Sequence, residues 1–322
     1  MKFFKSKFFL LFVSIIISLL IAEFICSVII NFPKYGVDKY VIGTEKFRFS
    51  NIYYKPYAEY LAREIGYKKF RRNNAGLTGN DIIFNDSTIK NIYLAGSSYI
   101  EALQVNSDSI ASTIFNSYLI KNNYKYQVIN AGAGGHTMYD SYFRILYMNN
   151  FFKINKVIYV LDWKRMYSQN LDFKIDENFG KKDNGIILNI HNFLRNNSSF
   201  INLTSEYIKP MFKIAKKWEL KENAGWTEIK EDKFLENIKL CIKEYHNKYS
   251  NDFIFFCTLN NNNIKDTLQF FCEANNINFF SDTAILTKEN MIERYGHFNN
   301  RGNYLLAQDL ILIFEKFINK IP

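Results

Sequence analysis

The sequence predicts an α/β domain in which a parallel β-sheet is covered by helices on both faces, together with an N-terminal transmembrane helix. The first observation is that, from residue 91 onward, short apolar segments alternate with amphipathic helical segments. The second is that residues 8–30 contain a single charged residue, Glu23. The composition, with 48% hydrophobic residues, 22% charged residues and only 4 Pro, excludes a disordered or low-complexity chain. Four Cys are too few for a disulfide-built scaffold.

The apolar N-terminal segment is long enough to cross a membrane. At 1.5 Å per residue, residues 8–30 would span roughly 35 Å as a helix, and a hydrocarbon core is about 30 Å thick. A cleaved signal peptide has a shorter apolar region and a small-x-small cleavage site, which residues 21–28 do not offer. We therefore expect a retained single-span anchor, residues 1–33, rather than a signal peptide or a buried core helix. The short N-terminal tail favours an anchor in the inner (cytoplasmic) membrane, with the rest of the chain facing the periplasm or the cell exterior.

The charge balance bears on possible partners. Lys and Arg number 41 against 31 Asp and Glu, a net charge of +10. This excess suits a surface that faces anionic lipid headgroups or acidic glycans. No nucleic-acid partner is expected, because the chain is predicted to be exported. Behind the anchor, we assign residues 34–90 to a linker or leading segment and residues 91–322 to the α/β domain.

The first half of the domain shows three strands and two helices in alternation. Short buried strands are expected at 91–95, 126–130 and 156–161, where apolar and β-branched residues dominate. Residues 108–121 carry apolar side chains at helical spacing, with Ser107 or Asp108 placed to cap the helix, and a second helix is expected at 137–148. Strands separated by helices of this size imply right-handed crossovers and a parallel sheet.

Residues 163–232 interrupt this alternation and are interpreted as an insertion without assigned structure. The pattern then resumes to the end of the chain. Helices are expected at 234–249, 264–274 and 301–321, and strands at 252–257 and 277–280. Parallel sheets of this kind bind ligands outside the carboxyl ends of their strands, so the candidate functional residues are sought there.

Three polar segments follow strands or precede the last helix. Gly96-Ser97-Ser98 comes after the first strand, where a strand-to-helix turn exposes a serine oxygen and leaves backbone N–H groups available to an oxyanion. Residues 130–136, Asn-Ala-Gly-Ala-Gly-Gly-His, follow the second strand. They fail as a dinucleotide fingerprint because Thr137 stands where the third glycine belongs. His297 lies in a loop that leads into the last helix.

Taken together, these segments resemble the SGNH (GDSL) hydrolase family. Gly96-Ser97-Ser98 looks like its nucleophile block, residues 130–132 like its second block, and His297 with Asn299 and Gly302 like its last block. Residues 73–79, Asn-Asn-Ala-Gly-Leu-Thr-Gly, resemble a segment that precedes the nucleophile strand in membrane-anchored bacterial members, whose anchor tends to contain a Glu. The resemblance implies a three-layer, flavodoxin-like fold.

The resemblance also implies roles for particular residues. Ser98 would be the nucleophile and His297 its general base, and the N–H groups of Ser98 and Gly132 would stabilise the tetrahedral oxyanion. His297 as a structural histidine is the alternative. His136, at the same end of the sheet, is the competing histidine for contact with substrate.

Three departures from the family pattern are visible. Ser97 replaces the Asp before the nucleophile, and Asp162 stands where the third block supplies an oxyanion Asn. A carboxylate at 162 would repel an oxyanion unless a nearby cation neutralised it. The triad Asp is absent from its usual place before His297; Glu293 is the candidate replacement, with Asp282 as a more distant one.

Two functions from different classes remain open. In the first, the protein is an exported, membrane-anchored serine esterase or O-acyltransferase that acts on ester groups, most simply O-acetyl groups, of cell-envelope carbohydrate. In the second, the fold is kept without catalysis, and the protein binds glycan or a partner membrane acyltransferase. Neither function needs a cofactor, and no His, Cys, Asp or Glu positions show the spacing of metal ligands.

Overall fold

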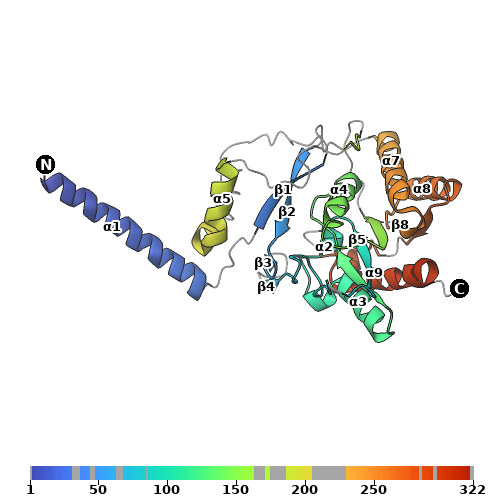
Figure 1. The fold of residues 1–322 in the computed structure, drawn as a ribbon, viewed down its shortest axis with the longest axis horizontal. Coiled ribbons are helices and arrows are strands. Elements are labelled where there is room, and N and C mark those ends of the chain that lie inside the picture. The colour runs from blue at the N-terminus through green and yellow to red at the C-terminus, as the bar shows by residue number, and fades with distance from the viewer. Residues whose placement is uncertain are drawn as a thin grey trace.

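The computed structural model contains an α/β body with an apolar helix projecting from it (Figure 1). The description below covers residues 2–30, 37–43, 48–62, 68–84, 86–162, 171–174, 186–204, 230–282, 285–292 and 296–319.

A five-stranded parallel sheet forms the centre of the body. Its strands are β5 (Lys90–Ala95), β6 (Tyr126–Asn130), β7 (Lys156–Leu161), β8 (Phe253–Cys257) and β9 (Asn278–Ser281). Their order across the sheet is β6-β5-β7-β8-β9, and every neighbouring pair is parallel. This is the flavodoxin-like order, and the predicted α/β fold is confirmed. The chain leaves β5 toward one edge and returns to its other side as β7, so the carboxyl ends of β5 and β7 flank the switch point.

Helices cover both faces of the sheet. On one face lie α4 (Met138–Met148), α7 (Glu231–Tyr249) and α8 (Asn262–Ala274); on the other lie α3 (Ala111–Lys121) and α9 (Asn300–Ile313), which continues as the π-helical turn η6 (Phe314–Ile318). Side chains alternate between the two cores along the strands: Tyr159 faces the α4 side and Ile158 the α3 side.

The start of helix α3 differs from the prediction. The helix expected at 108–121 begins only at Ala111, because residues 107–109 form a separate 3₁₀ turn and Ile110 precedes the helix without a side-chain cap. Neither Ser107 nor Asp108 therefore caps it. In contrast, Thr137 caps α4 in a capping box with Asp140.

The leading segment contains two antiparallel strand pairs and a stretch that packs on the body. The pairs are β1 (Val37–Gly43) with β2 (Arg48–Tyr54) and β3 (Glu59–Ala62) with β4 (Lys68–Arg71). Leu77 and Ile82 are buried in the core on the α4 side. The Gln127 side chain accepts the Ile83 N–H at 2.9 Å and donates to its carbonyl at 2.8 Å. These contacts fix the end of the leading segment against strand β6.

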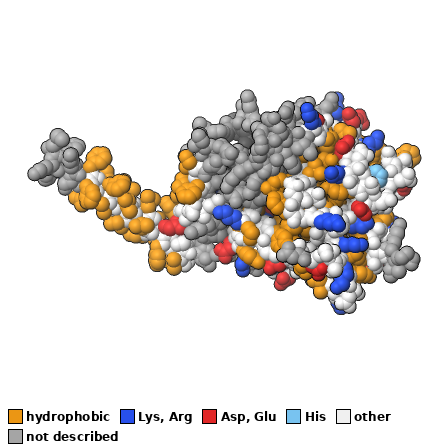
Figure 2. Space-filling view, in the orientation of Figure 1, with side chains coloured by type: hydrophobic (Ala, Val, Ile, Leu, Met, Phe, Trp, Pro, Cys, Tyr) orange, Lys and Arg blue, Asp and Glu red, His pale blue; other side chains and the backbone are white. Residues whose placement is uncertain are grey.

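The N-terminal helix stands apart from the body. It comprises α1 (Lys2–Phe24) and the π-helical turn η1 (Ile25–Ile29). Within the described residues, one helix, Lys7–Ile29, is long and apolar enough to cross a membrane, with a mean hydropathy of 2.8. Figure 2 shows hydrophobic side chains along its described surface. Part of the expected insertion is also helical: α5 (Ile186–Asn197) lies inside it, and α7 begins at Glu231, just before the expected end of the insertion.

Candidate active site

Ser98 lies where the first strand of the sheet turns into a short helix. β5 ends at Ala95, and Ser97 is the N-cap of α2 (Ser98–Glu101). The Ser97 Oγ accepts the Tyr99 N–H at 3.3 Å, so this turn is fixed locally. The Ser98 side chain is half-buried, and its N–H donates no hydrogen bond to any residue that the structure describes. The nucleophile candidate and one available N–H donor are therefore at the carboxyl end of β5.

The structure brings His297 to Ser98. The His297 Nε2 and the Ser98 Oγ are 2.9 Å apart, although the residues are separated by 199 positions. His297 is carried on a loop between Met291 and Phe298, which pair as an isolated antiparallel bridge. The Ile292 N–H donates to the His297 carbonyl at 2.7 Å. This is the arrangement of a nucleophile and its general base.

Tyr99 attaches the histidine loop to the nucleophile helix. Its hydroxyl donates to the Gly296 carbonyl, and its ring centroid lies 5.6 Å from that of His297 and 4.8 Å from that of Phe298. Burial, with the nearby Asp162 charge, raises the pKa of Tyr99 to about 12, so the hydroxyl remains a donor near neutral pH. The sequence predicts no separate role for Tyr99, although the family's nucleophile block is usually followed by an aromatic residue, as it is here.

The glycine loop after β6 contacts the nucleophile helix closely. A Cβ on Gly132 would lie 2.4 Å from the Glu101 backbone nitrogen, so only glycine fits. The Gly132 N–H donates to the Asn130 Oδ1 at 3.0 Å, and the Gly134 N–H donates to the Glu101 Oε2 at 2.7 Å.

The assignment of Gly132 as an oxyanion donor stays a prediction, and in this structure its N–H donates to a neighbouring side chain. Gly135, at φ +77°, is the better candidate in this loop. Its N–H donates to none of the described residues, and the adjacent Gly134 lies beside Ser98.

A buried ion pair supports the glycine loop from behind. The Arg72 Nη2 lies 3.1 Å from the Glu101 Oε1, and both side chains are almost fully buried. The Arg72 guanidinium also stacks on the Tyr54 ring, 3.4 Å from its centroid. Glu101 thus joins the leading segment, the nucleophile helix and the glycine loop. This pair was not predicted from the sequence. The available signal was a charged residue, Glu101, three positions after Ser98.

Asp162 occupies the carboxyl end of β7, beside the nucleophile turn. Its side chain is buried, and its Oδ2 accepts the Ser97 hydroxyl at 2.9 Å. Burial raises the pKa of Asp162 to about 7, and the hydrogen bonds from Ser97 oppose that rise only in part. Near neutral pH a large fraction of this carboxyl is uncharged, so the repulsion expected of a carboxylate at this place is reduced.

The remaining acids and histidine are placed as follows. Glu293, the candidate orienting acid, lies outside the described residues. Asp282, the alternative, follows β9 and hydrogen-bonds the Asp309 carboxyl, which together with burial raises the pKa of Asp309 to about 7. Desolvation, with the Arg144 charge, lowers the pKa of His136 to about 3. His136 is therefore uncharged near neutral pH and binds a second proton only weakly, which makes it a weaker candidate for the general base than His297.

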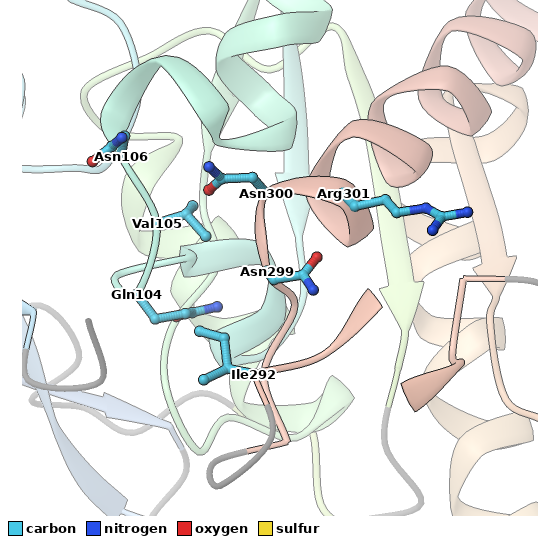
Figure 3. Close-up of a pocket in the computed structure, with 7 residues that line it drawn as sticks. All are labelled: Gln104, Val105, Asn106, Ile292, Asn299, Asn300 and Arg301. Carbon is cyan, nitrogen blue, oxygen red and sulfur yellow. The ribbon is translucent and has the colours of Figure 1, made fainter. Parts of the chain in front are cut away.

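A cavity of about 360 Å³ lies beside the histidine loop (Figure 3). Its wall is formed by the segment after α2 and by the two ends of that loop. Most lining side chains are uncharged amides: Gln104, Asn106, Asn299 and Asn300. Arg301 also lines the cavity, and its guanidinium is paired with Glu289. Neither Ser98 nor His297 lines this cavity. Among the described residues, no group of three or more His, Cys, Asp or Glu side chains is placed to hold a metal ion.

Comparison with known proteins finds similarity at the level of solved structures. No family model matches the sequence, and no curated protein matches it. The esterase EstA from Pseudoalteromonas sp. aligns with a TM-score of 0.44 at 10% identity, over 72% of this chain and 100% of that chain. A lipase/acylhydrolase from Enterococcus faecalis gives 0.39 at 16% identity, over 70% and 96%. The acetyl xylan esterase AlAXEase gives 0.37 at 15% identity, over 69% and 98%.

The TM-scores of these structures lie below 0.5, so they assign no activity to this chain. Functional conclusions depend on its own residues.

Proposed function

We propose that this protein is a membrane-anchored serine esterase or O-acyltransferase that acts on O-acyl, most simply O-acetyl, groups of cell-envelope carbohydrate. The observation that carries the proposal is the 2.9 Å contact between the Ser98 Oγ and the His297 Nε2 at the carboxyl edge of the sheet. A purely structural role for His297 does not explain why its ring contacts the hydroxyl of a half-buried serine at the switch point of the sheet, which is where such sheets bind ligands.

The chemistry follows from this pair. The Ser98 Oγ attacks the ester carbonyl carbon while His297 accepts the hydroxyl proton on Nε2. The tetrahedral intermediate collapses with loss of the alcohol, which takes the proton back from His297 and leaves an acyl group on Ser98. Water or a sugar hydroxyl then attacks the acyl-enzyme, with His297 again accepting and returning one proton. The first acceptor gives hydrolysis, and the second gives acyl transfer.

The developing oxyanion needs donors that are available in the resting protein. The N–H groups of Ser98 and Gly135 meet this condition, since neither donates to a described residue. Asp162 adds an O–H donor to this region when it is protonated. Removal of a single oxyanion donor typically raises the barrier by about 3 kcal/mol. Glu293 is proposed as the group that orients His297.

The substrate class is supported by the cavity and the charge. Amide side chains such as Asn106 and Asn300 donate and accept hydrogen bonds, which suits the hydroxyl groups of a glycan better than a hydrocarbon chain. The net charge of +10 favours an acidic envelope surface. With α1 in the inner membrane and the α/β body outside, the protein would meet acylated glycans or a membrane acyltransferase that donates acyl groups.

The test uses the full chain, purified in detergent, with a fluorophosphonate probe and an acetyl ester. We expect labelling and hydrolysis by the parent protein and neither by Ser98→Ala. Ser117→Ala is the matched control, because the Ser117 hydroxyl is bonded within α3 to the Thr113 carbonyl, away from the site. A folded parent protein that neither labels nor hydrolyses the ester would contradict catalysis and favour the second function, a binding protein for glycan or a partner acyltransferase.

A further inference from the structure

The carboxylate of Glu23, inside the apolar helix, is fully engaged by a second part of the chain. The Glu23 Oε2 accepts the Ser198 hydroxyl at 2.6 Å and the Phe200 N–H at 3.0 Å, and its Oε1 accepts the Ser199 N–H at 3.0 Å. Ser199 and Phe200 begin a helical segment, residues 199–204, whose first N–H groups have no partner within the segment itself. A carboxylate in this place is also stabilised by the helix dipole.

This contact fixes the depth of residues 198–200 relative to the apolar helix. Glu23 precedes the end of the apolar span, Ile29, by six positions, so it lies roughly 9 Å from that end at 1.5 Å per residue. The groups bonded to its carboxylate must lie at the same depth. If α1 crosses a membrane, they therefore lie at the hydrocarbon boundary or just inside it, where polar groups must be satisfied internally.

The adjoining helix α5 presents apolar side chains that the protein does not cover. Ile190, Phe193 and Leu194 are 56%, 65% and 41% exposed. Their spacing of three and four positions places them on one face of the helix. Figures 1 and 2 show α5 next to α1, with hydrophobic side chains on both.

Helix α5 and the helical segment 199–204 are joined by a buried arginine. Arg195 is fully buried, and its Nε and Nη2 donate to the Asn202 Oδ1 at 2.9 and 2.7 Å. The apolar face of α5 is thus carried on a unit that is itself bonded to α1, rather than on an unattached loop.

We propose that residues 186–204 form a membrane-docking element whose α5 face, Ile190, Phe193 and Leu194, inserts into the lipid leaflet beside the outer end of α1. The occupant is a lipid bilayer, because the exposed face is continuous with a helix of membrane-spanning length and is bonded to it through Glu23. The docking element gives the chain a second attachment to the membrane, which restrains how the body can rotate about its anchor. The proposal rests on α1 spanning a membrane.

The experiment uses the full chain in proteoliposomes of phosphatidylcholine and phosphatidylglycerol. Phe193→Cys is spin-labelled, and its collision rates with oxygen, which concentrates in lipid, and with a water-soluble nickel chelate are compared. Phe270→Cys is the matched control, since Phe270 is a single exposed phenylalanine, 74% accessible, on α8. Leu19→Cys, on α1, reports whether the anchor itself is inserted. The four native cysteines are buried, and the unsubstituted chain measures their background.

We expect oxygen-favoured collisions at 193 and at 19 and nickel-favoured collisions at 270. Nickel-favoured collisions at 193 with oxygen-favoured collisions at 19 would overturn the docking proposal while leaving the anchor intact. Nickel-favoured collisions at both would overturn the anchor as well. Spin–spin broadening at 193 without oxygen exposure would mean that a second copy covers the face, and would also overturn the proposal.

Glu23→Ala tests the connection to α1 independently. Loss of the carboxylate leaves the Ser199 and Phe200 N–H groups unpaired at the depth of the bilayer boundary. The label at 193 should then lose several-fold in its ratio of oxygen to nickel collisions, while the label at 19 stays unchanged. An unchanged ratio at 193 would contradict the role of Glu23.

Discussion

The two sides of the candidate site are held in different ways. On the nucleophile side, the buried Glu101 carboxylate accepts hydrogen bonds from both the buried Arg72 and the Gly134 N–H. On the other side, His297 sits on a loop that is attached near its tip by the Tyr99 hydroxyl and by short backbone contacts. This difference means that the position of Ser98 depends on the stability of the fold, whereas the position of His297 depends on a few bonds made by its own loop. Substitutions on the histidine side should therefore mainly lower activity, and substitutions on the nucleophile side should mainly lower the free energy of unfolding.

The largest effect on activity is expected on the histidine side. His297→Ala should lower kcat/KM for an acetyl ester by at least about 10⁴-fold, because Ser98 loses its proton acceptor. The unfolding midpoint of the full chain should change little, since the side chain is only half-buried. His246→Ala, on α7, is the control and should leave kcat/KM unchanged. A large loss of stability in His297→Ala would remove the contrast between the two sides.

On the nucleophile side the largest effect should be on stability. Glu101→Gln leaves the Arg72 guanidinium buried without its charge partner, which typically lowers the free energy of unfolding by about 3–5 kcal/mol. Glu289→Gln is the matched control, because the Glu289–Arg301 pair has the same 3.1 Å distance but side chains that are 75% and 66% exposed. That substitution should change the free energy of unfolding by at most about 1 kcal/mol. Equal losses in urea unfolding for the two variants would refute the structural role of Glu101.

A third prediction concerns the pH dependence of stability. Burial raises the pKa of Asp162 from 3.8 to about 7, so the folded state holds this proton to higher pH than the unfolded chain. Its contribution to stability is full below about pH 4 and is lost as the pH rises through about 7, with a slope that approaches about 1.4 kcal/mol per pH unit. Asp162→Asn should remove that slope from urea titrations between pH 4 and 7.

Asp309→Asn provides the comparison for this test, because burial, with the Asp282 carboxyl beside it, also raises the pKa of Asp309 to about 7. Each variant should remove its own part of the slope, and the double variant should remove both. The slope must be compared between variant and parent, because the lowered pKa of His136 adds a slope of opposite sign in the same range. Variants whose slopes equal that of the parent would show that neither carboxyl retains its proton.

The fold was predictable because its signals are local. Strand β6 and strand β7 match the expected ranges at both ends, since runs of β-branched and aromatic residues bounded by polar residues specify short buried strands. The predicted start of α3 was wrong because Ser107 and Asp108 belong to a separate 3₁₀ turn. Cap preference alone cannot distinguish a 3₁₀ turn from the first turn of an α-helix.

The site was predictable only in part. The order of the motifs placed Ser98 and His297 at the same edge, and the structure brings them together. Gly132 stays a predicted oxyanion donor, because the choice among three glycine N–H groups depends on where the Asn130 and Glu101 side chains turn. The pairing of Glu101 with Arg72, 29 positions away, depends on how the leading segment packs, which no local pattern encodes.

The smallest predicted effect concerns the attachment of the histidine loop. Tyr99→Phe keeps the ring contacts with His297 and Phe298 but removes the hydrogen bond to the Gly296 carbonyl. A bond of this kind contributes about 1 kcal/mol, so the free energy of unfolding should fall by that amount and kcat by about fivefold as the base becomes less well oriented. Tyr118→Phe is the control, because the Tyr118 hydroxyl bonds to the exposed Glu315 in η6 and to none of the site residues. Measured side by side, Tyr99→Phe should lower kcat with KM unchanged, whereas Tyr118→Phe should leave both unchanged; equal kcat values would show that the loop holds His297 in place without Tyr99.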